Sequence, residues 1–243
     1  MSPNFTASYS KKLNQKPECD SEAEIDSFHY LTREGDLLRI TEFALTGSDF
    51  HFYSQIIALG CSTEGFFASH ATELRKLNFS DEDIIGELLS LEMHDEDEDT
   101  LVGRVAYNDF TFHDGKAIKT GKQIRGIEII GDYQSTGIAK SVYKCLLMKH
   151  EYIICDNIQT IGGGALWASG MTSIGEVRIY DTIQEKFVDV LTRYGCGLNG
   201  VIPWSAQGLT QMDMSRWEPR KLSMESCHHI VNIISKDKIY DYE

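Results

Sequence analysis

Long apolar runs are missing from this sequence. None of its 243 residues lies in a stretch of the ~18–20 apolar residues that a membrane-spanning helix needs. Residues 1–20 are polar and lack the apolar core of a signal peptide. The sequence therefore predicts a cytoplasmic protein without a membrane partner. The polar composition at the N-terminus also predicts that residues 1–24 form a disordered tail.

Recognisable metal and nucleophile motifs are also missing. The chain has six cysteines but no C-x-x-C pair, and Cys145 and Cys155 lie within apolar runs, as buried free thiols do. The histidines do not form a zinc-ligand set, so no metal is expected. Neither a G-x-S-x-G motif nor a Cys/His nucleophile pattern stands out.

Positive charge is scarce. Lys and Arg total 23 against 37 Asp and Glu, which gives a net charge of −14. Nucleic acid is therefore an unlikely partner, because phosphate contacts need a basic surface. Residues 116–125 are locally basic, and this segment is either a solvated loop or the rim of a site for an anionic ligand.

Periodicity in the remaining sequence indicates a mixed α/β protein. Apolar spacing predicts helices over residues 66–77 and 80–91, the second capped by Ser80 with Asp83 three positions later. Strands are predicted over residues 37–45, 101–107, 175–181 and 229–234, with a turn at Asp114-Gly115. Residues 50–60 form either a helix or a buried strand. Residues 181–194 form either a helix capped by Thr182 and Glu185 or the second strand of a hairpin.

The most informative segment lies between an apolar strand and an amphipathic helix. The predicted strand 127–130 leads to Gln134-Ser135-Thr136-Gly137-Ile138-Ala139, and helical spacing over 137–150 is followed by a short strand at 152–155. Free N–H groups at a helix start favour a phosphate or pyrophosphate, and Gly137 lets an anion approach the backbone. The glycine spacings of dinucleotide-binding and triphosphate-binding loops are absent.

The pattern Gln134-x-x-Gly137-x-Ala139 resembles the pyrophosphate loop of the GNAT superfamily of acyl-CoA N-acyltransferases. The residues that follow add to this resemblance: Asp156, Gln159, a run of three glycines and Trp167 are similar to a divergent branch in tailed bacteriophages. The resemblance covers residues 126–190. It implies an α/β (α+β) fold, with a mixed, mostly antiparallel sheet flanked by helices and an N-terminal helical extension. The domains would be a mixed and helical region at 25–99, a core at 100–192 and a packed extension at 193–243.

The resemblance also implies a binding site for acetyl-CoA or another acyl-CoA as co-substrate. In such a site, the main chain at Ile129 and Ile130 would hold the pantetheine arm of the co-substrate. Without a role in binding, both would be ordinary core residues. The pyrophosphate would be bound by Gln134, Ser135, Thr136, Gly137, Ile138, Ala139 and Lys140.

Further site residues have alternative roles. Glu128 is either a base or a surface-facing strand residue, and Asp156 is either a base or the cap of the next segment. Gln159 either contacts ligand or braces its loop. Trp167 belongs either to the site or to the core.

Three functions follow as expectations. The first is an acyl-CoA-dependent N-acyltransferase acting on a small-molecule or protein amine. The second is a non-catalytic interaction protein on the same scaffold that binds a host protein. The missing tyrosine between Tyr152 and Tyr180, where family members often carry a general acid, and the acidic charge favour this option. The third is a nucleic-acid-modifying transferase that would use residues 116–125 as its contact surface.

Overall fold

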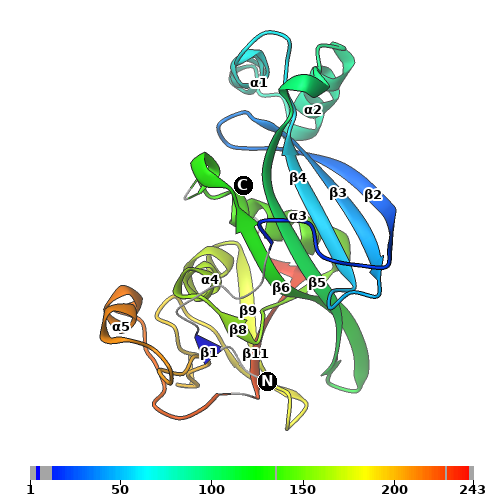
Figure 1. Cartoon of the computed structure of the whole chain (residues 1–243). Helices are drawn as coiled ribbons and strands as arrows, with labels where there is room; N and C mark the ends of the chain where they lie inside the picture. Colours follow the sequence, from blue (N-terminus) through cyan, green and yellow to red (C-terminus); the bar gives the residue numbers. More distant parts are fainter. Residues whose placement is uncertain (1–3, 6–12, 135, 228, 241–243) are drawn as a thin grey trace. The chain divides into compact units, whose positions relative to one another are not determined.

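The computed structural model describes residues 4–5, 13–134, 136–227 and 229–240, which divide into two compact units (Figure 1). The first unit comprises residues 13–106 and 127–141, and the second comprises the described parts of 1–12, 107–126 and 142–243. Across the described ranges, no helix is long and apolar enough to cross a membrane. Each unit contains both sheet and helix, which confirms the predicted mixed α+β class.

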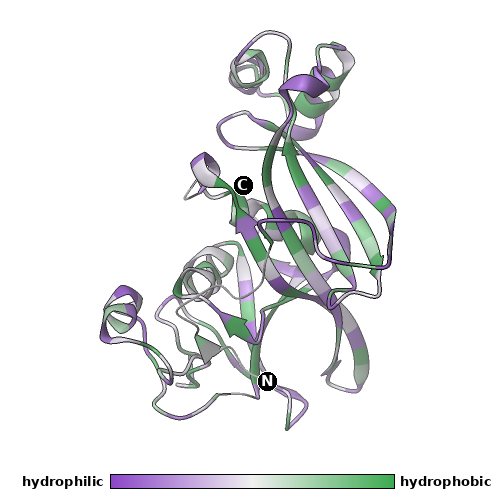
Figure 2. Cartoon of the chain, in the orientation of Figure 1, coloured by the Kyte–Doolittle hydropathy of each residue, from purple (hydrophilic) through white to green (hydrophobic). Residues whose placement is uncertain are grey.

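The first unit is built on a sheet whose strands β2, β3 and β4 are consecutive and antiparallel. Their bounds are Ser21–Leu31, Leu37–Thr46 and Phe52–Ala58. The long strands β5 (Thr100–Asp114) and β6 (Ala117–Ile129) follow in the sheet order, and both continue into the second unit. Figure 2 shows hydrophobic and hydrophilic residues alternating along these strands, as a sheet with one buried face requires.

Helices α1 (Phe66–Lys76) and α2 (Asp81–Ser90) lie at one end of this sheet (Figure 1). Ser80 caps α2, since its Oγ accepts the N–H of Asp83 at 3.1 Å. The apolar stripes of both helices pack on the strand ends in one cluster with Leu31, Leu37 and Leu59, to which the helices contribute Phe67, Ala71, Leu74, Ile84 and Leu88. Helical spacing thus predicted both helices and their buried faces.

The second unit contains a mixed sheet in the order β10-β9-β11-β7-β6-β5. Helix α3 (Ile138–His150) leads from β6 to β7 (Tyr152–Ile154), which is parallel to β6. Strand β11 (Ile230–Ile239) pairs antiparallel with β7 and with β9 (Gly175–Asp181), and β10 (Lys186–Val190) completes a hairpin with β9. The predicted strand–helix–strand unit and the hairpin alternative for residues 181–194 are confirmed.

Short elements complete the second unit. Strand β1 (Asn4–Phe5) is parallel to β8 (Ile158–Gln159), and α4 (Ile161–Ala165) and α5 (Gln211–Trp217) follow them in the chain. A single turn of π-helix spans Leu166–Gly170. The Phe5 ring lies 4.7 Å from the Trp217 ring and 6.2 Å from the Trp204 ring, so β1 is anchored by aromatic packing.

Alanine substitutions at two neighbouring glycines of α4 are expected to have different effects on the free energy of unfolding. A Cβ at Gly164 would lie 2.5 Å from the Phe5 ring, whereas one at Gly163 would meet nothing closer than 3.5 Å. Gly164→Ala should lower the free energy of unfolding by about 1–3 kcal/mol through overpacking. Gly163→Ala should leave it unchanged or raise it by up to about 1 kcal/mol through helix propensity. Urea unfolding of both variants tests this, and equal changes would show that Phe5 does not pack on Gly164.

Several predictions were wrong. The described part of the predicted disordered tail is ordered, because Leu13 is fully buried and β2 begins at Ser21. The N-terminal extension, predicted as mixed and helical, contains β2, β3 and β4 before its helices, and of the two alternatives for residues 50–60 the strand is the one observed, as β4. Residues 116–125 are not a loop but lie largely in β6. The predicted core at 100–192 coincides with neither compact unit.

Candidate functional site

The loop that joins β6 to α3 is tied back to the end of its own strand. Gln134 Nε2 donates to the Ile129 carbonyl oxygen at 2.8 Å, and Thr136 Oγ1 donates to the Tyr133 carbonyl oxygen at 2.7 Å. Gly137 then adopts a φ of 89°, a left-handed conformation that glycine accommodates without strain, and α3 begins at Ile138. The sequence therefore placed the strand, the turn and the helix start correctly, while Ser135 lies outside the described residues.

The start of α3 is open to a ligand. A Cβ on Gly137 would have no heavy atom within 4 Å. Among the described residues, no backbone carbonyl accepts a hydrogen bond from the N–H groups of Ile138, Ala139 or Lys140. Thr136, Gly137 and Lys140 are exposed, whereas the Ile138 side chain is buried, so Ile138 presents only its main chain. These N–H groups and the positive end of the helix dipole favour an anion here.

Strand β6, which precedes the loop, offers a ligand fewer free backbone N–H groups than the sequence predicts. The Ile130 N–H donates to the Val102 carbonyl oxygen at 2.8 Å, so Ile130 cannot supply that group to a ligand. Because alternate residues of a strand bond to opposite neighbours, the Ile129 N–H points away from β5. The expected pair of main-chain contacts is thus corrected to Ile129 alone. Glu128 and Ile129 are both half-buried.

Asp156 lies in the second compact unit, two residues after the end of β7. The ladder between β6 and β7 has only two pairs, Lys122–Ile153 and Gln123–Ile154. Asp156 follows it, 8% exposed, with Oδ1 accepting the Asn157 N–H at 2.7 Å and lying 3.7 Å from Arg125 Nε. Its contacts with Asn157 and Arg125 support a bracing role for Asp156, and its role as a base stays a prediction.

The structure decides the two remaining alternatives. Gln159 is 5% exposed, and its amide donates to the Asp156 carbonyl oxygen at 3.1 Å and accepts from Trp204 Nε1 at 3.2 Å. Gln159 therefore braces its loop. Trp167 is 2% exposed and packs 6.1 Å from the Tyr143 ring, which makes it a core residue.

A cavity of about 700 Å³ opens in the first unit beside Tyr133, which lies in the loop between β6 and α3. Tyr133 lines it together with the start of α1, the end of β4 and residues 98 and 100. Burial, and then the carboxylates of Asp36 and Asp132, raises the pKa of Tyr133, so its hydroxyl stays protonated at neutral pH. No sequence motif includes Tyr133, because the loop motif begins one residue later, at Gln134.

The second unit has its own cavity of about 410 Å³, lined by Phe110, Thr111, His113, Asn157, Tyr180, Thr182 and Glu185. Within residues 4–5, 13–134, 136–227 and 229–240, no three His, Cys, Asp or Glu side chains gather as a metal site would require. No protein-family model matches this chain, and neither a curated protein nor a solved structure shows a significant match.

Proposed function

We propose that the protein binds an acyl-CoA at the loop between β6 and α3 and transfers the acyl group to an amine. The observation that carries this proposal is the helix start at Ile138. A Cβ on Gly137 would have no heavy atom within 4 Å, and in the described chain no backbone carbonyl accepts the N–H groups of Ile138, Ala139 or Lys140. A diphosphate needs this combination of donors and free volume. The exposed Lys140 adds a positive charge on the first turn of the helix.

The chemistry of the residues present fits the group that the GNAT resemblance implies. The bound co-substrate would supply an activated acyl group as a thioester. In the superfamily, the strand before the loop splays from its neighbour and exposes N–H groups to pantetheine. The Ile129 N–H, which is turned away from β5, supports the same kind of main-chain contact here.

Two side chains of the first unit are candidates for proton transfer. Glu128 is a half-buried carboxylate on β6 and is proposed as the base that receives the amine proton. The Tyr133 hydroxyl holds its proton at neutral pH and is proposed as a proton donor. We propose a cytoplasmic location, where the six free cysteines would stay reduced.

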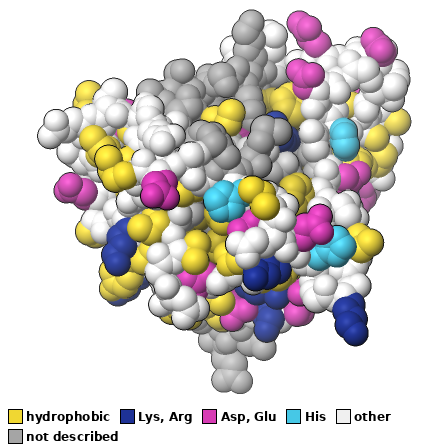
Figure 3. Space-filling model, turned by 90° about the horizontal axis from the view of Figure 1, so that it is seen from below, with side chains coloured by type: hydrophobic (Ala, Val, Ile, Leu, Met, Phe, Trp, Pro, Cys, Tyr) yellow, Lys and Arg dark blue, Asp and Glu magenta, His cyan; other side chains and the backbone are white. Residues whose placement is uncertain are grey.

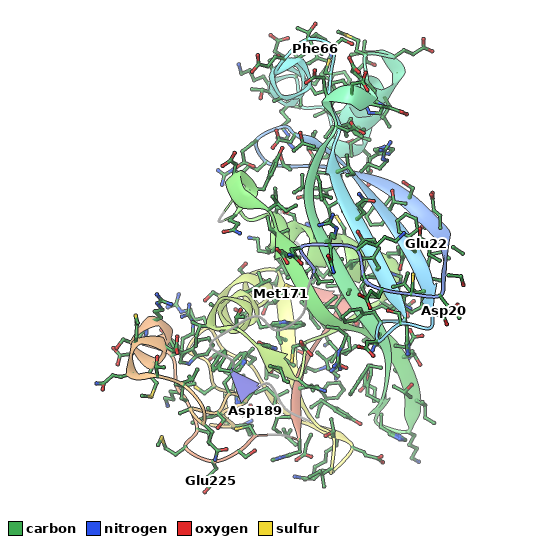
Figure 4. The ribbon with its side chains drawn as sticks, in the orientation of Figure 1. Asp20, Glu22, Phe66, Met171, Asp189 and Glu225 are labelled. Carbon is green, nitrogen blue, oxygen red and sulfur yellow. The ribbon has the colours of Figure 1, made fainter. Side chains whose placement is uncertain are left out.

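The second candidate is a non-catalytic protein that binds a host protein through an acidic surface. The observation that favours it is the edge strand β2, whose exposed acids include Glu22 (labelled in Figure 4), Glu24 and Asp26. An acidic edge strand suits a basic partner. The third option, a nucleic-acid-modifying transferase, is weakened because Lys122 and Arg125 already pair with Asp109 and Asp156. On the face in Figure 3, acidic and basic side chains are interspersed.

Calorimetric titration with acetyl-CoA and with pantetheine tests the proposal. Acetyl-CoA should bind with micromolar affinity, and pantetheine, which lacks the diphosphate, at least about tenfold more weakly, a difference of about 1.4 kcal/mol. Release of free CoA thiol should then rise when polyamines or lysine peptides are added. Binding without thiol release would favour the non-catalytic alternative. Equal affinity for both compounds, or no binding, would exclude the diphosphate site.

A further inference from the structure

The cavity of about 410 Å³ in the second unit is enclosed by three separate segments of the chain. Its lining residues come from β5, from the segment after β7, and from β9 with the turn that follows it: Phe110, Thr111 and His113, then Asn157, then Tyr180, Thr182 and Glu185. Pockets that hold small ligands have volumes of about 300–1,000 Å³ and a few convergent polar groups. This cavity meets both conditions.

Tyr180 offers the cavity a buried hydroxyl group. The residue is 2% exposed, and its ring packs edge-on against the rings of Phe112 at 5.8 Å and Phe187 at 5.2 Å. The hydroxyl oxygen accepts the His113 N–H at 3.0 Å, but among the described residues the hydroxyl proton has no acceptor. A buried donor without an acceptor destabilises a fold, so a hydrogen-bonding group inside the cavity would complete the bonding of Tyr180.

Asn157 offers a second donor, and its neighbours fix its orientation. Gln123 Nε2 donates to the Cys155 carbonyl oxygen at 3.1 Å and to Asn157 Oδ1 at 2.8 Å. Because a carbonyl oxygen only accepts, the first bond identifies the Gln123 atom as the nitrogen, and the Asn157 atom that faces it must be the oxygen. The Asn157 NH₂ group therefore points away from Gln123, and no acceptor within the described ranges bonds it.

The charges in the cavity disfavour both an anion and a simple cation. Of the described residues that line it, none is Lys or Arg, and Glu185 is the single carboxylate, with its Oε2 3.7 Å from His113 Nε2. A phosphate or carboxylate ligand would meet the Glu185 charge without a Lys or Arg to balance it. An ammonium ligand has only donors, so it would leave the donors of Tyr180 and Asn157 unpaired.

We propose that this cavity binds a neutral sugar residue. Sugar hydroxyl groups both donate and accept, so they can accept hydrogen bonds from Tyr180 and Asn157 and donate one to Glu185. The C–H face of the sugar ring would lie on the Phe110 ring, which also lines the cavity. A flat heterocycle fits less well, because the Tyr180 ring is already packed in the core and the Phe110 ring offers stacking on one side alone.

Saturation-transfer NMR titrations with the methyl glycosides of glucose, galactose and N-acetylglucosamine test the proposal. The wild type should bind at least one of them with a Kd of about 1–10 mM, the range expected for a ligand with so few atoms. Tyr180→Phe removes one donor and keeps the ring, and Asn157→Asp removes the other while keeping the acceptor for Gln123. Glu185→Ala removes the acceptor. Each substitution should weaken binding about tenfold.

Tyr152→Phe is the matched control. Tyr152 packs edge-on against the same Phe112 ring, at 5.2 Å, and is not among the residues that line the cavity, so losing its hydroxyl should leave the affinity unchanged. Glu185 is exposed, so Glu185→Ala keeps the fold and decides the outcome if Tyr180→Phe unfolds. No saturation transfer to any of the glycosides, or equal affinities of Tyr152→Phe and the folded cavity variants, would overturn the proposal. The probes contain no diphosphate, so neither result affects the acyl-CoA proposal.

Discussion

Replacing Gly137 with glutamate is expected to weaken acetyl-CoA binding by more than 100-fold. The new carboxylate would enter the space where no heavy atom lies within 4 Å of a Cβ, which the proposal assigns to the diphosphate. Two like charges about 4 Å apart near a protein surface repel by about 4 kcal/mol. A hundredfold loss corresponds to about 2.7 kcal/mol, so the electrostatic effect alone is sufficient.

Gly200→Glu provides a matched control for the backbone. Gly200 has a φ of 94°, close to the 89° of Gly137, and a Cβ there also meets nothing within 4 Å. Both substitutions therefore introduce similar left-handed strain and the same charge. Isothermal titration should show unchanged affinity for Gly200→Glu. Equal losses in both variants would assign the effect to folding, and retained binding by Gly137→Glu would place the diphosphate elsewhere.

The second large effect, on the free energy of unfolding, is expected when Asp189 is replaced. Its carboxylate is hydrogen-bonded to backbone N–H groups of the segment after β10. Its carboxylate accepts N–H groups of Val190 and Asn199 at 2.8 and 3.0 Å, and of Val201 at 3.1 Å (Figure 4). Asp189→Asn exchanges one acceptor oxygen for a donor that faces these N–H groups. The loss should be about 2–3 kcal/mol in free energy of unfolding at pH 7, because hydrogen bonds to a charged group are involved. Urea unfolding measures it.

The pH dependence of this effect has a defined sign. Burial raises the pKa of Asp189, but the N–H groups of Asn199, Val190 and Val201 outweigh it and hold the pKa below the ordinary value. The stabilisation is therefore complete above the unfolded pKa of about 3.9 and is lost as pH falls through the lower folded value. The difference between wild type and Asp189→Asn should shrink below about pH 4.

Asp109→Asn is the control for this prediction. Asp109 pairs with Lys122 on the surface at 2.7 Å, and exposed ion pairs contribute about 0.2–1 kcal/mol. Replacing Asp109 with asparagine should therefore lower the free energy of unfolding much less than Asp189→Asn does. A loss for Asp109→Asn as large as that for Asp189→Asn would show that the hydrogen bonds around Asp189 are not the cause.

Local signals in the sequence were sufficient for much of the fold. The Ser80 cap, the helical spacing of α1, α2 and α3 and the strand before Gly137 each depend on residues within one or two turns of each other. Such signals also located the start of α3. The helix α5 was missed, although Thr210 and Asp213 form a capping box there, because the apolar spacing around it is weak.

Contacts between distant segments set the limits of prediction. In the sequence, the run of glycines at 162–164 indicated only a family resemblance, but Gly164 is required by Phe5 from a strand far earlier in the chain. Ile130 was predicted to bind pantetheine, and only the pairing with Val102 shows that its N–H is occupied. In each case, the residue that determines the structural role is far away in the sequence, so local sequence patterns do not reveal it.

We propose that main-chain N–H groups at the start of α3 bind a diphosphate. Amide chemical shifts of ¹⁵N-labelled protein, titrated with acetyl-CoA and separately with pantetheine, test it most directly. We expect the largest shifts with acetyl-CoA, and only small shifts with pantetheine, at Gly137, Ile138, Ala139 and Lys140. Shifts confined to other residues, or identical responses to the two compounds, would contradict it.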